Sequence, residues 1–360
     1  MPTFCRHNRF IERCPICSKT LPGRSPSGRS PRGTARGRAT GSDASRRHGV
    51  RREGVRVQRE GRAGDDGYRS ALVPGLRASA DATRLVEEIA FSSGRLLALA
   101  AAPPGLYGEI RALAAEDKGA ATWACFLTAY LSPLEGEDPF AGIRMVLSGA
   151  PDPVSGSGEE GDAGADGLPD LSEVPLGPRT SHDPARGAET LIAYRQWVRR
   201  AGSPGASSAA SSVGDGAAGG GSQELAFAGD PGWSPERRFE RLFERLALPG
   251  FARIGRYDLL VTLGRLGLYE LRASSLYLGG ARGLSADDPT TLAAKRVFGI
   301  GDPLLLERRA AALAEAASVP VEALDLALAN WAAAQRATLG LAPDTLDPDA
   351  FERAGEALGL

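Results

Sequence analysis

The chain has 360 residues, of which 42% are apolar and 24% charged, so it is long enough to bury a sizeable core. Its formal net charge of −1 is unevenly distributed, and its 46 glycines and 25 prolines indicate extensive spacer segments. No apolar stretch is long and uninterrupted enough for a membrane span, so we expect no membrane contact and a cytoplasmic protein.

Residues 1–20 contain a cluster of potential metal ligands. Cys5 and His7 form one pair, and Cys14 and Cys17 form a CxxC pair, which is the spacing of a small tetrahedral zinc site. These residues are predicted to form a zinc knuckle around a structural Zn²⁺ with four protein ligands. A disulfide or free thiols are the alternative, although arginines interrupt any apolar leader that would direct the chain to an oxidising compartment.

An arginine-rich segment follows at residues 21–67. Its part from 21 to 62 carries twelve arginines and three acidic residues among Gly, Ser and Pro, and it cannot bury enough apolar surface to fold. We therefore predict a disordered basic arm, set against an acidic remainder. Such an arm attracts nucleic acid without sequence preference, and a solvated linker of biased composition is the open alternative.

Helical spacing of apolar residues predicts a first helical segment at residues 80–147. Leu85, Ile89, Leu96 and Leu97 form the apolar face of its first helix, and Cys125 is interpreted as a small buried hydrophobe. Residues 148–233, which include an acidic stretch, are predicted to be loop and low-complexity insertions with one short helix. The helices expected here span 81–102, 107–115, 122–131 and 190–200.

The most regular part of the chain is residues 234–336. Ser234 is a predicted N-cap before Pro235, and residues 337–360 are interpreted as a C-terminal tail. Strand signals are scarce, so the predicted fold is mainly α. The helices expected after the first one of this segment span 258–266, 288–298, 303–317 and 320–336.

A helix-hairpin-helix pattern lies within this segment. Gly299 and Gly301 would let the backbone turn tightly, and the next helix start can hold a phosphate through free N–H groups. Together with Lys295 and Arg296, these glycines are predicted to bind the DNA backbone; a plain turn between two helices is the alternative. Asp302 opposes a phosphate by its charge, and could instead share a monovalent or divalent cation with hairpin carbonyl groups.

One carboxylate stands in apolar company on the last of these helices. Asp325 lies among Val321, Leu324, Leu328 and Trp331, which mark the core face. If buried, an aspartate there would have a raised pKa, which suits a catalytic acid; if it faces solvent or caps a neighbour, it has no such meaning. The competing candidates for this role are Glu322 and Asp302.

Several strings resemble one family, the α-glutamyl/putrescinyl thymine pyrophosphorylases, clade 3. The resemblance extends over residues 80–335 without the linkers. The strings are DPFAGIR (138–144), GPRTSHDP (177–184), YDLLVTLGRLG (257–267), AKRVFGIGDP (294–303) and ALDLAL (323–328).

The resemblance implies an α-helical, DNA-glycosylase-like domain that acts on 5-substituted pyrimidines in DNA. Phage relatives install amino groups on a thymine whose 5-hydroxymethyl group carries an activated phosphate, which implies a DNA kinase or similar base-modifying partner. Bacterial relatives are expected to excise hypermodified bases or otherwise counter modified phage DNA. Asp325 matches an aspartate that faces the flipped nucleotide in such glycosylases. The hairpin lysine of bifunctional glycosylases is replaced by Asp302 and Pro303, so no Schiff-base lyase step is expected.

Three polar residues in the Gly/Pro-rich segment are secondary candidates. His182 and Asp183 are candidate catalytic residues and Arg179 a candidate DNA contact, although an exposed loop could carry them by chance. The sequence thus predicts a nucleoid-associated enzyme that acts on a modified pyrimidine in DNA. The alternatives are a non-enzymatic DNA-binding sensor or adaptor, and a zinc-dependent module that binds a protein partner.

Overall fold

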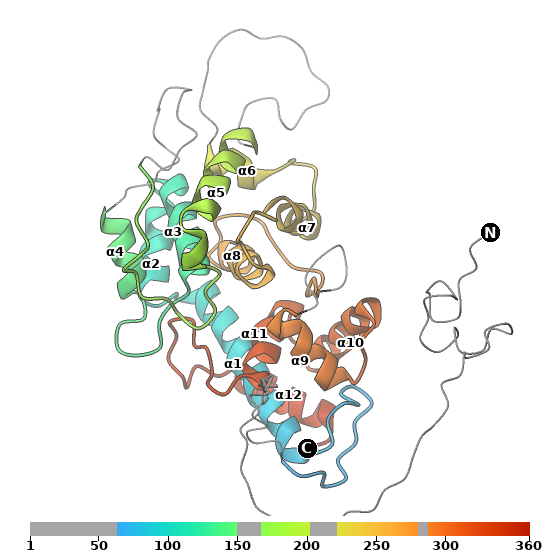
Figure 1. Cartoon of the computed structure of the whole chain (residues 1–360). Helices are drawn as coiled ribbons and strands as arrows, with labels where there is room; N and C mark the ends of the chain where they lie inside the picture. Colours follow the sequence, from blue (N-terminus) through green and yellow to red (C-terminus); the bar gives the residue numbers. More distant parts are fainter. Residues whose placement is uncertain (1–62, 150–166, 202–221, 280–286) are drawn as a thin grey trace, which may run out of the picture. The chain divides into compact units, whose positions relative to one another are not determined.

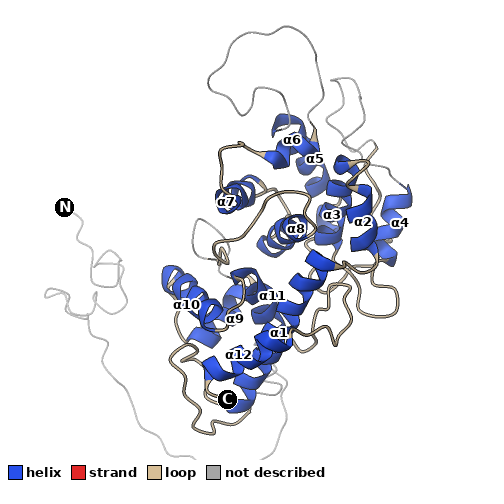
Figure 2. Cartoon of the chain, turned by 180° about the vertical axis from the view of Figure 1, so that it is seen from behind, coloured by secondary structure: helices blue, strands red, loops and turns tan. Residues whose placement is uncertain are grey.

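The computed structural model describes residues 63–149, 167–201, 222–279 and 287–360 (Figure 1). The chain divides into two units, 1–57 and 58–360, and every described residue lies in the second. Within the described ranges the structure is helical, with no strand (Figure 2), which confirms the predicted mainly α fold. No helix in these ranges is both long and apolar enough to cross a membrane.

Helix α1 (Ser79–Ala101) belongs to both groups of helices that make up this unit. Along its length it contacts α8 from the first group and α11 and α12 from the second (Figures 1 and 2). The first group consists of α2 (Leu106–Leu113), α3 (Lys118–Leu131), α4 (Ala141–Gly149), α5 (Glu189–Ala201), α6 (Gln223–Ala228), α7 (Pro235–Arg245) and α8 (Arg253–Arg265). The second consists of α9 (Pro289–Phe298), α10 (Pro303–Ala316), α11 (Val321–Ala332) and α12 (Pro348–Leu358).

The two groups share one core. Buried apolar residues from α1 through α12 form a single large cluster, which includes Leu85, Phe126, Leu260 and Leu324. Cys125 belongs to it and is fully buried, as predicted, and burial raises the pKa of its thiol. Leu97 differs from the expectation, because it is 55% exposed on the outer face of α1.

The cap predicted at Ser234 forms, whereas two other helices begin earlier than expected. Ser234 Oγ accepts a hydrogen bond from Arg237 N at 3.3 Å at the start of α7, as its position predicts. Helix α3 begins earlier than expected, at Lys118, because Asp117 Oδ1 accepts from Ala120 N at 2.8 Å. Helix α8 also begins earlier than expected, at Arg253. Its start was not predicted because the N-cap residue Ala252 has no capping side chain and so gives no signal in the sequence.

Three helices were not expected, namely α4, α6 and α12. The interpretation of residues 337–360 as a tail needs correction, because α12 packs against α1. Ser93 Oγ donates to Asp347 Oδ2 at 2.6 Å at the start of α12, and Tyr68 Oη donates to Leu358 O at its end. The buried positions of α12 are two alanines and one leucine, which form a weak apolar stripe in the sequence.

Gly355 lies inside α12 with open space where a side chain would begin, since nothing lies within 4 Å of an added Cβ atom. We expect Gly355→Ala to raise the free energy of unfolding by about 0.5–1 kcal/mol, because alanine loses less backbone entropy in a helix. Urea unfolding of the full chain measures this. A decrease would show that α12 is strained or frayed at this position.

Candidate active site: a buried chain of charges

Five charged side chains form a continuous chain inside the protein. Arg179 binds Asp258 in a bidentate pair, with Nε to Oδ2 at 2.9 Å and Nη2 to Oδ1 at 3.2 Å. The same Nη2 atom also donates to Asp325 Oδ2 at 2.8 Å. Arg253 continues the chain, with Nη2 donating to Asp325 Oδ1 at 2.6 Å and Nε lying 2.9 Å from Asp288 Oδ2. Asp325 is therefore clamped between two guanidinium groups, one on each oxygen.

These residues come from four separate segments of the chain. Arg253 and Asp258 lie on α8, Asp325 lies on α11, and Asp288 is the N-cap of α9. Arg179 comes from the connection between α4 and α5. The chain of charges therefore joins the two helix groups at one point.

Backbone hydrogen bonds to the end of α3 hold the Arg179 loop in place. Gly177 N donates to Leu131 O at 3.0 Å, and Ser181 N donates to Tyr130 O at 2.9 Å. Arg179 N itself donates to a side-chain oxygen of this region, Ser132 Oγ, at 3.3 Å. Because its backbone is fixed on both sides, Arg179 reaches the interior with its guanidinium already oriented.

The charge network sets the ionisation of its members. Burial alone would raise the pKa of Asp325, which is 1% exposed, but Arg253 and Arg179 outweigh burial and lower it below the ordinary value of 3.8. Burial likewise opposes the charge of both arginines, and their carboxylate partners outweigh it and raise the pKa of each. The raised pKa that the sequence suggests for a buried Asp325 is therefore corrected, and the group is a stable carboxylate.

The stability that Asp325 contributes should depend on pH. Its folded pKa lies below its unfolded value, so the contribution is complete above the ordinary value of 3.8 and is lost as the pH falls towards the lowered pKa. Urea midpoints measured from about pH 6 down to about pH 2 should fall more steeply for the natural chain than for Asp325→Asn. Parallel curves would contradict this account.

The competing carboxylates lie elsewhere. Glu322 is buried on α11, where Oε1 accepts from Ala273 N at 3.0 Å and Oε2 lies 3.3 Å from Arg265 Nη2. Asp302 is exposed and caps α10, with Oδ1 accepting from Leu304 N and Leu305 N at 2.9 and 3.1 Å. Neither is part of the buried chain of charges.

His182 and Asp183 lie close to Arg179 in sequence but point to other partners. His182 Nδ1 is 2.8 Å from Tyr130 Oη, and burial lowers the pKa of His182 below 6.5 while Asp183 acts in the opposite direction. Asp183 is exposed and caps the short 3₁₀ helix Pro184–Arg186 through Ala185 N. Of the three secondary candidates, the structure brings only Arg179 to Asp325.

The predicted hairpin joins α9 and α10, which contact each other. Gly299 ends α9 in the left-handed region with φ 63°, and an added Cβ would lie 3.2 Å from Gly75 Cα. Gly301 and Arg296 are exposed and Lys295 is half-buried. Asp302 occupies two N–H groups of α10 that would otherwise face a phosphate, so a DNA contact here stays a prediction.

The metal predictions remain expectations. Cys5, His7, Cys14 and Cys17 lie outside the described residues, as does the arm up to residue 62. Across the described ranges, no three His, Cys, Asp or Glu side chains gather as a metal site, at the hairpin or elsewhere.

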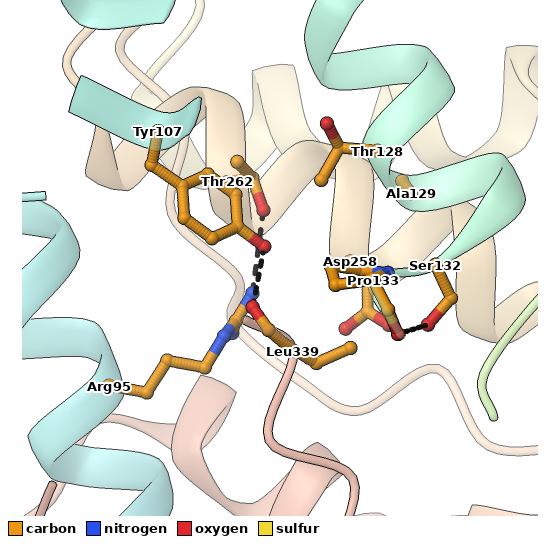
Figure 3. Close-up of a pocket in the computed structure, with 9 residues that line it drawn as sticks. All are labelled: Arg95, Tyr107, Thr128, Ala129, Ser132, Pro133, Asp258, Thr262 and Leu339. Atoms are coloured by element: carbon orange, nitrogen blue, oxygen red, sulfur yellow. Dashed lines mark hydrogen bonds between the residues drawn. The ribbon is translucent and has the colours of Figure 1, made fainter. Parts of the chain in front are cut away.

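A small polar cavity borders the chain of charges (Figure 3). Its volume is about 10 Å³, and its walls come from α1, α2, α3, α8 and the segment after α11. The polar side chains that line it are Arg95, Tyr107, Thr128, Ser132, Asp258 and Thr262. Burial raises the pKa of Tyr107 to about 12, so its hydroxyl group stays protonated and donates to Leu339 O at 3.0 Å.

Sequence reasoning missed Arg95, Arg253, Asp258 and Asp288. The signal for the two on α8 was their setting, because nearly every residue of this helix is buried and yet it carries several charges. A charged residue on a helix without a polar face must find a buried partner. Asp288 gave only a helix-cap signal, which it also fulfils by accepting from Thr291 N at 2.9 Å.

Comparison with known proteins supports the family resemblance over part of the chain. Residues 221–337 match the family model described as alpha-glutamyl/putrescinyl thymine pyrophosphorylase clade 3. The match confirms the family suggested by the sequence, over a shorter range than the expected 80–335. No curated protein and no solved structure matches the chain. Arg253, Asp258, Asp288 and Asp325 lie within the matched residues, whereas Arg179 lies outside them.

Proposed function

We propose that this protein is an enzyme that acts on a 5-substituted, thymine-type base in DNA, by excising the base or by transfer at its 5-methylene substituent. The family name indicates a pyrophosphorylase-like enzyme for a modified thymine. The observation that carries the proposal for this protein is the buried chain of charges. Four of its five members lie in the segment that matches the family model.

The physical argument starts from the cost of such a network. Burying ion pairs gains little stability over apolar packing, because desolvation offsets much of the attraction. Clusters of buried ionisable groups with shifted pKa values are typical of functional sites. The planar donors of Arg179 and Arg253 suit phosphate and carboxylate oxygens, and Arg179 Nη1 is buried with no hydrogen-bond partner in the structure.

The basic arm, the zinc knuckle and the hairpin have a place in this proposal as DNA-binding parts. The base would be flipped out of the duplex before reaction, and the basic arm, the zinc knuckle and the hairpin would supply sequence-independent affinity. A DNA kinase or similar partner would prepare the base, and the enzyme would work at the nucleoid. A monovalent or divalent cation at the hairpin would add to this affinity.

The test is a panel of DNA substrates that contain thymine, 5-hydroxymethyluracil, its phosphorylated form or a glycosylated pyrimidine. After incubation with the full chain, mass spectrometry of released bases and digested nucleosides separates the outcomes. A free modified base supports excision, and an altered nucleoside seen only with an amine donor supports transfer. No change on any substrate with DNA binding intact would overturn the enzyme proposal.

One observation favours a second candidate, a non-enzymatic DNA-binding sensor or adaptor. Both oxygens of Asp325 are engaged by arginines and its side chain is 2% exposed, as expected of a structural ion pair. Asp325→Asn separates the two candidates, because an enzyme should lose turnover while keeping DNA affinity. Asp349→Asn is the matched control, since Asp349 is exposed on α12.

The role of the arm is tested by deletion. Asp66 Oδ2 accepts from Ser79 N at 2.9 Å at the start of α1, so the deletion should end at residue 62. We expect weaker DNA binding and a flatter salt dependence, because fewer counterions are released. Unchanged affinity would remove the arm from the DNA account and favour a zinc-dependent protein-binding module.

A further inference from the structure

Exposed large apolar side chains are concentrated in one part of the described structure. Nine such side chains reach solvent in the described ranges, and six of them lie between residues 289 and 360. They form two groups, with Leu292, Leu304 and Leu305 on α9 and α10, and with Leu346, Phe351 and Leu360 on or beside α12. Single exposed apolar residues are ordinary, whereas a concentration of them marks a surface that binds a partner.

The first group belongs to a surface that we call the hairpin face, namely Leu292, Arg296, Leu304, Leu305 and Arg308. Leu304 is 71% exposed in the first turn of α10, and Arg308 lies one turn further on the same side of the helix. Leu292 and Arg296 repeat this spacing on α9. Both arginines are exposed, and neither forms an ion pair with a described side chain. The hairpin face is therefore apolar with unpaired positive charge.

Leu346 and Phe351 of the second group form, with Glu352 and Glu356, a surface that we call the α12 face. The two apolar side chains are 47% and 44% exposed. Glu352 and Glu356 are exposed one turn apart on α12, and neither forms an ion pair with a described side chain. Like charges at this spacing repel each other. The α12 face is therefore apolar with unpaired negative charge.

The two faces are complementary. Each exposes apolar side chains, and the unpaired guanidinium groups of one are opposite in sign to the unpaired carboxylates of the other. Contact between the faces of two copies would remove the apolar side chains from water and pair the charges at the same time. DNA would pair with the hairpin face alone and would leave the α12 face uncovered, because its phosphates repel carboxylates. The occupant that fits both faces is a second copy of this chain.

One copy presents both faces on neighbouring helices, because α10 contacts α12 (Figures 1 and 2). We propose that two copies of this chain associate by reciprocal contacts, in which the hairpin face of each copy docks on the α12 face of the other. Such an arrangement has twofold symmetry and closes as a dimer. This inference does not rest on the proposed function. A hairpin in the dimer is covered, so the copies must separate before the hairpin contacts DNA.

Charge reversal in two separate variants of the full chain tests this arrangement. The hairpin-face variant carries Arg296→Glu and Arg308→Glu, and the α12-face variant carries Glu352→Arg and Glu356→Arg. Each variant alone brings like charges together at both contacts, so its dimer dissociation constant should be at least about tenfold higher than that of the natural chain. An equimolar mixture of the two variants has opposite charges at both contacts, and should associate about as tightly as the natural chain.

Sedimentation equilibrium without DNA gives these dissociation constants and needs no enzymatic activity. The matched control carries Glu116→Arg and Glu137→Arg, which are exposed carboxylates outside both faces. Its dissociation constant should stay within about twofold of the natural value, because exposed substitutions outside a contact have small effects.

Three outcomes would overturn the inference. The first is a natural chain that stays monomeric up to about 1 mM. The second is weaker association in the α12-face variant alone, since another segment such as the basic arm would then cover that face. The third is a mixture of the two variants that stays monomeric, because the hairpin face and the α12 face would then not contact each other.

Discussion

Replacing Asp325 by alanine should lower the free energy of unfolding of the full chain by about 3–5 kcal/mol. The carboxylate is 1% exposed and holds Arg179 and Arg253 at 2.8 and 2.6 Å. Without it, two guanidiniums that cannot be deprotonated would face one cavity with only their outer partners, Asp258 and Asp288. The loss should therefore exceed that of an ordinary truncation of the same size.

Urea unfolding of the natural chain and of the variant measures this change. Asp349→Ala is the matched control, because the same truncation at an exposed site should alter stability by less than about 0.5 kcal/mol. A double variant that combines Asp325→Ala with Arg179→Met should recover part of the loss, since it removes one of the stranded charges. If Asp325→Ala lowers the free energy of unfolding no more than Asp349→Ala does, the network contributes nothing to the stability of the fold.

Much of the fold could be predicted because its signals are local. Ser234 before Pro235 and Asp302 before Pro303 both cap helices as expected, since a cap depends only on residues within one turn. The early start of α8 at Ala252 has no such signal. Helix α12 was missed because its buried face is mostly alanine, and only tertiary contact with α1 makes it part of the core.

The site could be predicted only in part. Asp325 and Arg179 each drew attention separately, but they lie 146 residues apart, and nothing in the sequence indicates that they touch. Their pairing reverses the expected pKa shift of Asp325, because a guanidinium outweighs the effect of burial. Asp258 was present in a string that carried the family resemblance, but a charge on a mostly buried helix shows only that it needs a partner and not which residue that partner is.

Replacing Gly177 by alanine should disrupt the site from a distance. An added Cβ would lie 2.0 Å from Pro133 O and 2.5 Å from Ser132 O, and both are backbone atoms that no rotamer change can move. The loop must therefore shift away from the end of α3, which breaks the Gly177 N to Leu131 O hydrogen bond. We expect a loss of about 3 kcal/mol in the free energy of unfolding, at the upper end for overpacking.

The same shift should displace Arg179, because this residue follows the glycine by two positions and reaches Asp258 and Asp325 from a fixed backbone. Activity on the modified-base substrate should then fall further than the loss of stability alone predicts. Activity is measured for both proteins well below the temperature at which either one unfolds. Gly355→Ala is the matched control, since its Cβ meets no atom within 4 Å. A Gly177→Ala protein with natural stability and activity would show that the loop can relax without moving Arg179. The buried chain of charges would then not depend on the close approach of this loop to α3.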